Sequence, residues 1–104
     1  MQVHIKAKGV PGSSILRRLA SGKLNTGLLP FSNLIQDVTL CFSDINGPLR
    51  GGIDKLCRMV LILNNSSVII IEELGSDFSK ITDRVIDRLN RQLSTSFGTL
   101  QFSG

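Results

Sequence analysis

Apolar and polar residues alternate over residues 2–8, where the chain shows its first regular pattern. Val3, Ile5 and Ala7 fall on one side, and polar residues occupy the positions between them. A period of two sends successive side chains to opposite faces of a strand. The pattern therefore predicts a strand with one buried face over residues 2–8.

A helix is predicted next. Ser13 or Ser14 can cap it, because a serine hydroxyl accepts a hydrogen bond from the free backbone N–H groups of a first turn. Its predicted buried stripe, at helical spacing, consists of Ile15, Leu16, Leu19, Ala20 and Lys23–Leu24. Gly22 and Gly27 each weaken a helix by about 1 kcal/mol relative to Ala. The end of the helix is therefore left open as far as Pro30, which must terminate it.

Three strands and a second helix follow. The strands are predicted at residues 35–43, 56–63 and 68–72, which are rich in β-branched and other apolar residues. The loop over residues 44–53 is too long and too rich in glycine for a tight hairpin, whereas residues 64–67 predict a short turn. Ser76 or Asp77 opens a helix that runs to about Ser94. Its predicted buried seam is Phe78, Ile81, Val85, Leu89 and Leu93, flanked by Thr82 and Ile86.

These elements follow the order β-α-β-β-β-α. We predict an α+β fold: a two-layer sandwich in which a four-stranded mixed sheet carries both helices on one face. Residues 1–95 form a single domain, and residues 96–104 form a loosely ordered tail.

Composition indicates a folded, basic protein. Hydrophobic residues make up 41% of the 104 residues, and twelve Lys and Arg against eight Asp and Glu give a net charge of +4. The excess favours a polyanionic partner. We expect a cytoplasmic protein that does not enter a membrane, since the first residues lack a secretory pattern and the longest apolar runs are too short to span a bilayer.

The residue types needed for catalysis are poorly represented. His4 is the single histidine, and nothing near it in the sequence supplies a nucleophile or an orienting partner. No Cys and His spacing fits zinc. We expect Cys41 to point outward and Cys57 inward, so that the two thiols stay unpaired. The sequence therefore predicts a protein that is not an enzyme and that has no metal, cofactor or small-molecule substrate.

Basic residues form the one chemical pattern that stands out. Lys80, Arg84, Arg88 and Arg91 are spaced to line a single stripe of the second helix. Arg17, Arg18 and Lys23 lie on the first helix, and side-by-side helices would combine both sets into one basic surface for phosphates. The alternative is a solvated face neutralised by Asp83 and Asp87, and the residues alone leave both interpretations open. Arg50, Lys55 and Arg58 predict a second basic patch around the glycine-rich loop. The alternative is that this loop is only a mobile connector, and the residues alone leave this open too.

The segment from Cys41 to Arg58, CFSDINGPLRGGIDKLCR, resembles the "SDxNGPRGGxDKxCR" segment of the ribosome hibernation-promoting and ribosome-associated inhibitor family. The run Ile69–Glu73 followed by Asp77-Phe78, and the pairs Asp83-Arg84 and Asp87-Arg88, are similar to further parts of that family's pattern. The resemblance implies the same β-α-β-β-β-α fold. It also implies binding to the small ribosomal subunit and its 16S rRNA, in the cleft used by messenger and transfer RNA, so that idle ribosomes stay out of translation. The length is that of the family's short, single-domain members.

A second hypothesis comes from the outer face of the predicted sheet. Leu56, Val60 and Ile62, together with Cys41, make that face more apolar than a strong ribosome binder needs. Exposed apolar surface more often marks a contact between proteins. The alternative function is therefore a non-enzymatic interaction module of the same fold, which forms a weak homo-oligomer or binds a protein partner through this face.

Overall fold

The structure, a computed structural model, describes residues 1–7, 9–10, 12–45 and 54–95. Its elements are β1 (Gln2–Ala7), α1 (Ser13–Gly27), the 3₁₀ helix η1 (Leu29–Phe31), β2 (Ile35–Asp44), β3 (Lys55–Leu63), β4 (Val68–Gly75) and α2 (Phe78–Leu93). The predicted element order is confirmed. The predicted tail, most of the glycine-rich loop and Arg50 lie outside the described residues.

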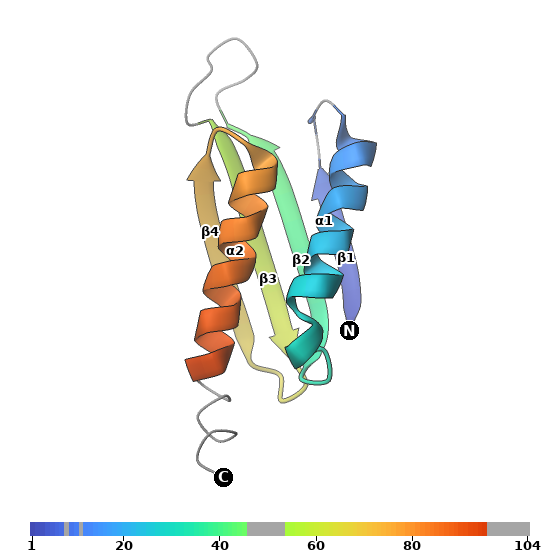
Figure 1. The fold of residues 1–104 in the computed structure, drawn as a ribbon, viewed down its shortest axis with the longest axis vertical. Helices are drawn as coiled ribbons and strands as arrows, with labels where there is room; N and C mark the ends of the chain where they lie inside the picture. Colours follow the sequence, from blue (N-terminus) through green and yellow to red (C-terminus); the bar gives the residue numbers. More distant parts are fainter. Residues whose placement is uncertain (8, 11, 46–53, 96–104) are drawn as a thin grey trace.

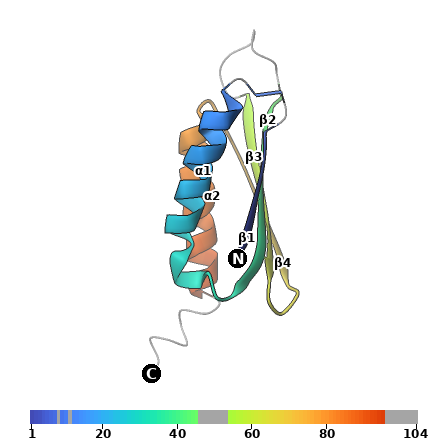
Figure 2. The same cartoon turned by 90° about the vertical axis from the view of Figure 1, so that its right-hand side faces the viewer.

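The four strands form one sheet in the order β1-β2-β3-β4 (Figure 1). β1 pairs with β2 in parallel, and the pairs β2–β3 and β3–β4 are antiparallel. Both helices lie on the same face of this sheet, as Figure 2 shows from the side. The predicted two-layer α+β sandwich with a mixed sheet is therefore confirmed.

The core lies between the sheet and the helices. Every second residue is buried from Val38 to Phe42 on β2 and from Cys57 to Leu63 on β3, and Leu40 and Met59 face each other across the strand pair. Phe42 on β2 meets Phe78 of α2 edge to face, with ring centroids 5.2 Å apart. Full burial of a side chain of this size contributes about 1.5–3 kcal/mol. This apolar layer fixes which faces of α1 and α2 are left for solvent.

α2 follows its predicted pattern closely. Asp77 is the N-cap, and its side chain accepts hydrogen bonds from the backbone N–H groups of Ser79 and Lys80 at 2.8 and 3.2 Å. The buried residues are Ile81, Thr82, Val85, Ile86, Leu89 and Leu93, with Phe78 partly buried. The seam predicted from the sequence is confirmed, because one apolar stripe at helical spacing can face only one side.

α1 differs from its prediction in two respects. The N-cap is Gly12 in the left-handed conformation, with φ of 68°, and neither Ser13 nor Ser14 supplies a side-chain cap. Ile15 is 75% exposed and Leu19 44% exposed, so both were wrongly assigned to the buried stripe. The sheet covers only the narrow face of α1 that carries Ala20 and Leu24. Apolar residues further round the helix therefore remain outside the core.

The two helices pack against each other at Gly27. A Cβ atom at this position would lie 2.6 Å from Cγ2 of Ile86, so the absence of a side chain permits the approach. The side-chain amide of Asn90 donates a hydrogen bond to the carbonyl of Gly27 at 2.9 Å. The end of α1, which the sequence left open, is thus fixed by its packing against α2.

Candidate nucleic-acid interface

Two arginines of α2 reach across to β4. Arg84 Nη2 donates to the carbonyl of Leu74 at 2.7 Å, and Arg88 Nη1 donates to the carbonyl of Glu72 at 3.0 Å. Both guanidinium groups also pair with the carboxylate of Glu73, Arg84 through Nε at 3.7 Å and Arg88 through Nη1. Two positive charges share one negative charge here, so the cluster keeps a net positive charge while its arginines hold the helix to the strand.

Lys80 and Arg91 complete the basic stripe of α2. Arg91 Nη2 lies 2.7 Å from Oδ2 of Asp87, which confirms the i,i+4 pair expected for these residues. Lys80 is exposed and, within the described part of the chain, forms no ion pair. The helical spacing places the whole stripe on the flank of α2 that faces β4, away from α1.

Two basic residues of α1, Arg18 and Lys23, line a groove between the helices. Lys23 Nζ lies 2.6 Å from Oδ1 of Asp83 on α2, so this lysine is engaged in an interhelical ion pair. Arg17 and Arg18 are exposed and form no ion pair with the residues that the structure describes. The groove measures about 610 Å³ and is lined by Arg18, Leu19, Gly22, Lys23, Thr26, Gly27, Asp83 and Ile86.

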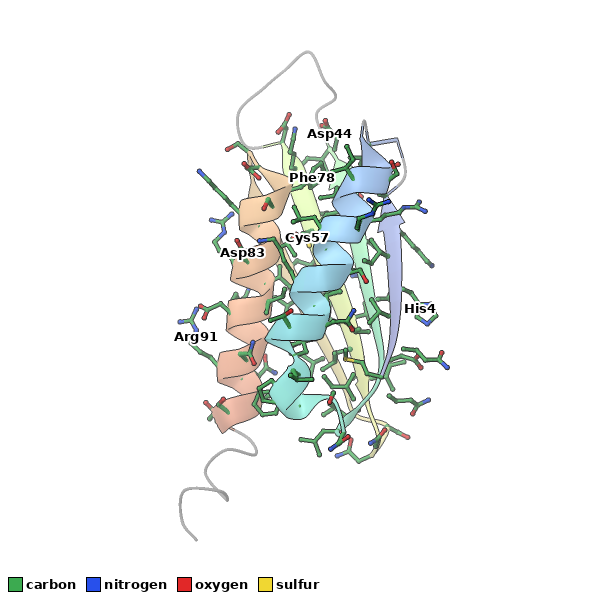
Figure 3. The ribbon with its side chains drawn as sticks, turned by 45° about the vertical axis from the view of Figure 1, so that its right-hand side comes forward. His4, Asp44, Cys57, Phe78, Asp83 and Arg91 are labelled. Carbon is green, nitrogen blue, oxygen red and sulfur yellow. The ribbon has the colours of Figure 1, made fainter. Side chains whose placement is uncertain are left out.

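The prediction of one uninterrupted basic surface over both helices is wrong. Asp83, labelled on α2 in Figure 3, lines the groove between the helices and neutralises Lys23 of α1. Arg84 and Arg88 lie on the other flank of α2, held by Glu73. The helix layer therefore presents two basic strips separated by an acidic residue. Of the cations in these two strips, Arg17, Arg18 and Lys80 form no ion pair with the residues that the structure describes.

The predicted second basic patch is also divided. Lys55 Nζ turns to the helix side, 3.2 Å from Oδ1 of Asp54, 3.7 Å from Oδ2 of Asp44 and 5.5 Å from the ring centre of Phe78. Asp54 is only 2% exposed, so Lys55 serves chiefly to compensate a buried carboxylate. Arg58 lies on the opposite face of the sheet, since residues an odd number apart on a strand face opposite ways. Lys55 and Arg58 therefore do not form one patch.

Sequence reasoning also missed the acidic partners Glu73 and Asp37. Glu73 holds both Arg84 and Arg88, and Asp37 lies 3.4 Å from Nε2 of His4 on the adjacent strand. β1 and β2 pair in parallel with Gln2 opposite Asp37, so His4, two residues further along β1, lies diagonally across from Asp37 on the same face. A correct prediction of this strand register would have found the pair. Figure 3 places His4 far from Arg91, so the histidine takes no part in the helix-layer chemistry.

The two cysteines are unpaired, as predicted, with Cys57 buried and Cys41 partly exposed. Burial, with a smaller contribution from Cys41, raises the pKa of the Cys57 thiol to about 12. A thiol in this state is a poor nucleophile, because only the thiolate reacts. In the described ranges no group of His, Cys, Asp and Glu could hold a metal ion, and no helix there is long and apolar enough to cross a membrane.

The outer face of the sheet is apolar along β3 and β4. Leu56, Val60 and Ile62, which the sequence singled out, are partly exposed there. β4 adds Val68, Ile70 and Leu74, which are 57%, 51% and 48% exposed. These three were missed because an isolated run of isoleucines and valines does not reveal which strand lies at the sheet edge.

The fold is shared with solved structures of other proteins. A ribosomal subunit interface protein from Coxiella burnetii superimposes with a TM-score of 0.72 at 23% identity, covering 92% of this chain and 97% of that one. The N-terminal domain of Protein Y from Thermus thermophilus gives a TM-score of 0.70 at 17% identity, covering 91% and 98%. No protein-family model and no curated protein sequence matches the chain. At these identities the similarity establishes the fold.

Proposed function

We propose that the chain is a ribosome-associated translation inhibitor, or hibernation factor, which binds ribosomal RNA of the small subunit through its helix layer. The observation that carries the proposal is the fold shared, over nearly the whole of both chains, with a ribosomal subunit interface protein. The sequence resemblance around residues 41–58 supports the same assignment. The proposal places the protein in the cytoplasm, where ribosomes work.

Exposed cations supply the physical basis for binding. Arg17, Arg18 and Lys80 are exposed and unpaired within the described residues, so a phosphate can bind them without first breaking an ion pair. Guanidinium groups bind phosphate oxygens in a bidentate manner. We expect these residues to make the first contacts, with Arg91, Arg84 and Arg88 adding charge from the flank. Lys23, Lys55 and Arg58, along with Arg50, are secondary candidates.

The proposed mechanism is steric. A domain that occupies the messenger and transfer RNA channel prevents translation without any chemical step, and the family resemblance supports this position. Such binding needs no cofactor and no small-molecule substrate. It is expected to weaken as salt rises, because each phosphate contact releases counterions.

Co-sedimentation with ribosomes in a sucrose gradient tests the proposal. The protein is expected to travel with small subunits at low salt and to dissociate at high salt. The double variant Arg18→Ala/Lys80→Ala should lose most of this association. The variant Lys6→Glu lowers the net charge by the same two units on the sheet, away from every proposed contact, and should keep it. Equal loss in both variants would show that net charge, rather than the helix layer, determines binding.

The alternative, a protein-interaction module, is supported by the apolar outer face of β3 and β4. Val68 and Ile70 are each more than half exposed. Apolar side chains grouped on an exposed face often mark a contact between proteins. If this alternative holds, Val60→Lys should abolish self-association or partner binding, and the helix-layer variants should leave it unchanged.

A further inference from the structure

β4 is an edge strand with half of its backbone hydrogen-bonding groups directed away from the sheet. The amide of Leu63 donates to the carbonyl of Ser67 at 2.9 Å. In this register the backbone N–H and C=O groups of the odd-numbered residues of β4 point toward β3. Backbone groups in an antiparallel strand alternate sides. Val68, Ile70, Glu72 and Leu74 therefore direct their N–H and C=O groups to the open edge.

The second half of this edge is occupied by side chains of α2. Arg84 and Arg88 donate to the carbonyls of Leu74 and Glu72. Charged side chains laid over an edge prevent pairing with another strand. No described side chain hydrogen-bonds to the backbone of Val68 or Ile70, so the first half of the edge remains open.

The open half is apolar and uncharged. Val68 and Ile70 are 57% and 51% exposed on the outer face, and Ile69 is partly buried on the helix side. Residues 64–71 contain no charged side chain. Two such segments can approach without electrostatic repulsion between them and without burying an unpaired charge.

We propose that this open edge, residues 68–71, binds the same edge of a second copy of the chain in antiparallel pairing. With Ile69 opposite Ile69 of the second copy, Val68 lies opposite Ile70 of the other chain. The pair exchanges both backbone hydrogen bonds, and its exposed side chains cover each other on the outer face. Apolar β-branched pairs across antiparallel strands stabilise the contact further.

The arginines disfavour a register shifted toward Glu72. Centring the pair on Ile70 instead would place Val68 opposite Glu72, whose carbonyl already accepts a hydrogen bond from Arg88. α2 runs opposite to β4, so its last turns lie level with the open half of the strand (Figure 1). Arg91 there is paired with Asp87, so a second helix meets a locally neutral pair. A continuous sheet across two copies is the result.

Sedimentation measured over a concentration series up to about 1 mM, a range that detects even weak association, tests this proposal. Wild-type protein should shift from monomer to dimer as concentration rises. Ile70→Pro removes the edge-facing N–H and should give a monomer throughout, because proline is tolerated at a sheet edge yet cannot donate. Ile70→Val keeps both the N–H and an apolar β-branched side chain, and should still dimerise.

Two further variants separate the remaining explanations. Val60→Lys alters the outer face on β3, directly across from Ile70, and leaves the edge-facing N–H and C=O groups of β4 in place, so the dimer should persist. Its loss together with retention in Ile70→Pro would show face-to-face stacking and overturn the proposal. Arg88→Ala frees the carbonyl of Glu72 and should strengthen association. A wild-type chain that stays monomeric at every concentration also overturns the proposal. Binding of an extended peptide to the edge would not rescue it, because the proposed partner is a second copy of the chain. Ribosome binding plays no part in these measurements, so they stand independently of the proposed function.

Discussion

Lys23 Nζ lies 2.6 Å from Oδ1 of Asp83, and this ion pair joins α1 to α2 across the groove between them. The pair places a negative charge in the middle of the layer that we propose for RNA binding. Its lysine is about one quarter exposed and its aspartate more than half exposed. Exposed pairs of this kind contribute only about 0–1 kcal/mol to stability. Its main effect is thus on the charge pattern of the surface.

Asp83→Asn should therefore strengthen ribosome binding. The substitution removes the charge that separates the two basic strips and leaves Lys23 free to contact a phosphate, while unfolding free energy should fall by at most about 1 kcal/mol. Co-sedimentation at increasing salt is the measurement, and the variant should stay bound at a higher salt concentration than wild type. Asp37→Asn makes the same change in net charge on the sheet and should have little effect. An equal gain from both substitutions would mean that the position of Asp83 is irrelevant.

Arg88 is expected to matter for folding, and Arg91 is not. Arg88 holds the carbonyl of Glu72 and the carboxylate of Glu73, whereas Arg91 has, among the residues that the structure describes, an ion pair only with Asp87 on its own helix. Arg88→Ala should lower the free energy of unfolding by about 1–2 kcal/mol, and Arg91→Ala by less than about 0.5 kcal/mol. Urea titration followed by circular dichroism measures both. Equal costs would contradict the structural role of Arg88.

This difference bears on mutational tests of function. Replacing Arg84, Arg88 and Arg91 together would not test their charge alone. Because Arg84 and Arg88 bind the backbone of β4, loss of ribosome binding in that triple variant would combine structural and charge effects. Variants at Arg18 and Lys80 avoid this problem.

Gly27→Ala should destabilise the protein, and Gly22→Ala should stabilise it. A Cβ atom at Gly27 would lie 2.6 Å from Cγ2 of Ile86, so the helices must move apart, at a cost of about 1–3 kcal/mol. A Cβ atom at Gly22 meets nothing within 4 Å, and Ala is favoured over Gly in a helix by about 1 kcal/mol. Thermal unfolding of the two variants makes the comparison. A stable Gly27→Ala variant would show that the helices do not meet as described.

The thiols should differ in reactivity. At pH 8 an alkylating reagent should modify Cys41 in the native protein and reach Cys57 only after unfolding, because burial raises the pKa of Cys57 to about 12. Mass spectrometry of the labelled peptides gives the answer. Equal labelling of both thiols in native protein would place Cys57 outside the core.

The same pKa shift predicts a loss of stability in alkaline solution. The unfolded chain releases the Cys57 proton near pH 9, while the folded chain holds it up to about pH 12. Stability from this thiol is complete below pH 9 and falls by up to about 1.4 kcal/mol per pH unit above it. Cys57→Ala should be less stable at pH 7 and should lose less on going to pH 10, as denaturant titrations at both pH values would report.

The buried seam of α2 could be predicted from the sequence because its apolar residues occupy one narrow stripe. α1 could not be predicted in the same way. Ile15 and Leu19 extend its apolar surface beyond the part that the sheet covers, and no local pattern reveals the width of that contact. Strand assignments succeeded because alternation on β1 and β2 directly reports which face is buried.

Most of the ion pairs could not be predicted from the local sequence. Asp87 and Arg91 pair within one helix, and their spacing is sufficient to predict the contact. Lys23 and Asp83 are 60 residues apart and meet only because both helices lie on the same face of the sheet. Glu73 engages Arg84 and Arg88 because β4 is the edge strand under α2. Such pairs depend on tertiary packing.

The salt dependence of binding to purified small ribosomal subunits tests the central claim most directly. If the helix layer contacts ribosomal RNA, log affinity should fall linearly with log salt concentration, and Arg18→Ala/Lys80→Ala should reduce that slope by about 0.7–0.9 for each phosphate contact removed. Lys6→Glu, which lowers the net charge by the same two units outside the proposed contacts, should leave the slope as in wild type. A wild-type affinity independent of salt, or a slope that the helix-layer variant does not change, would contradict the account.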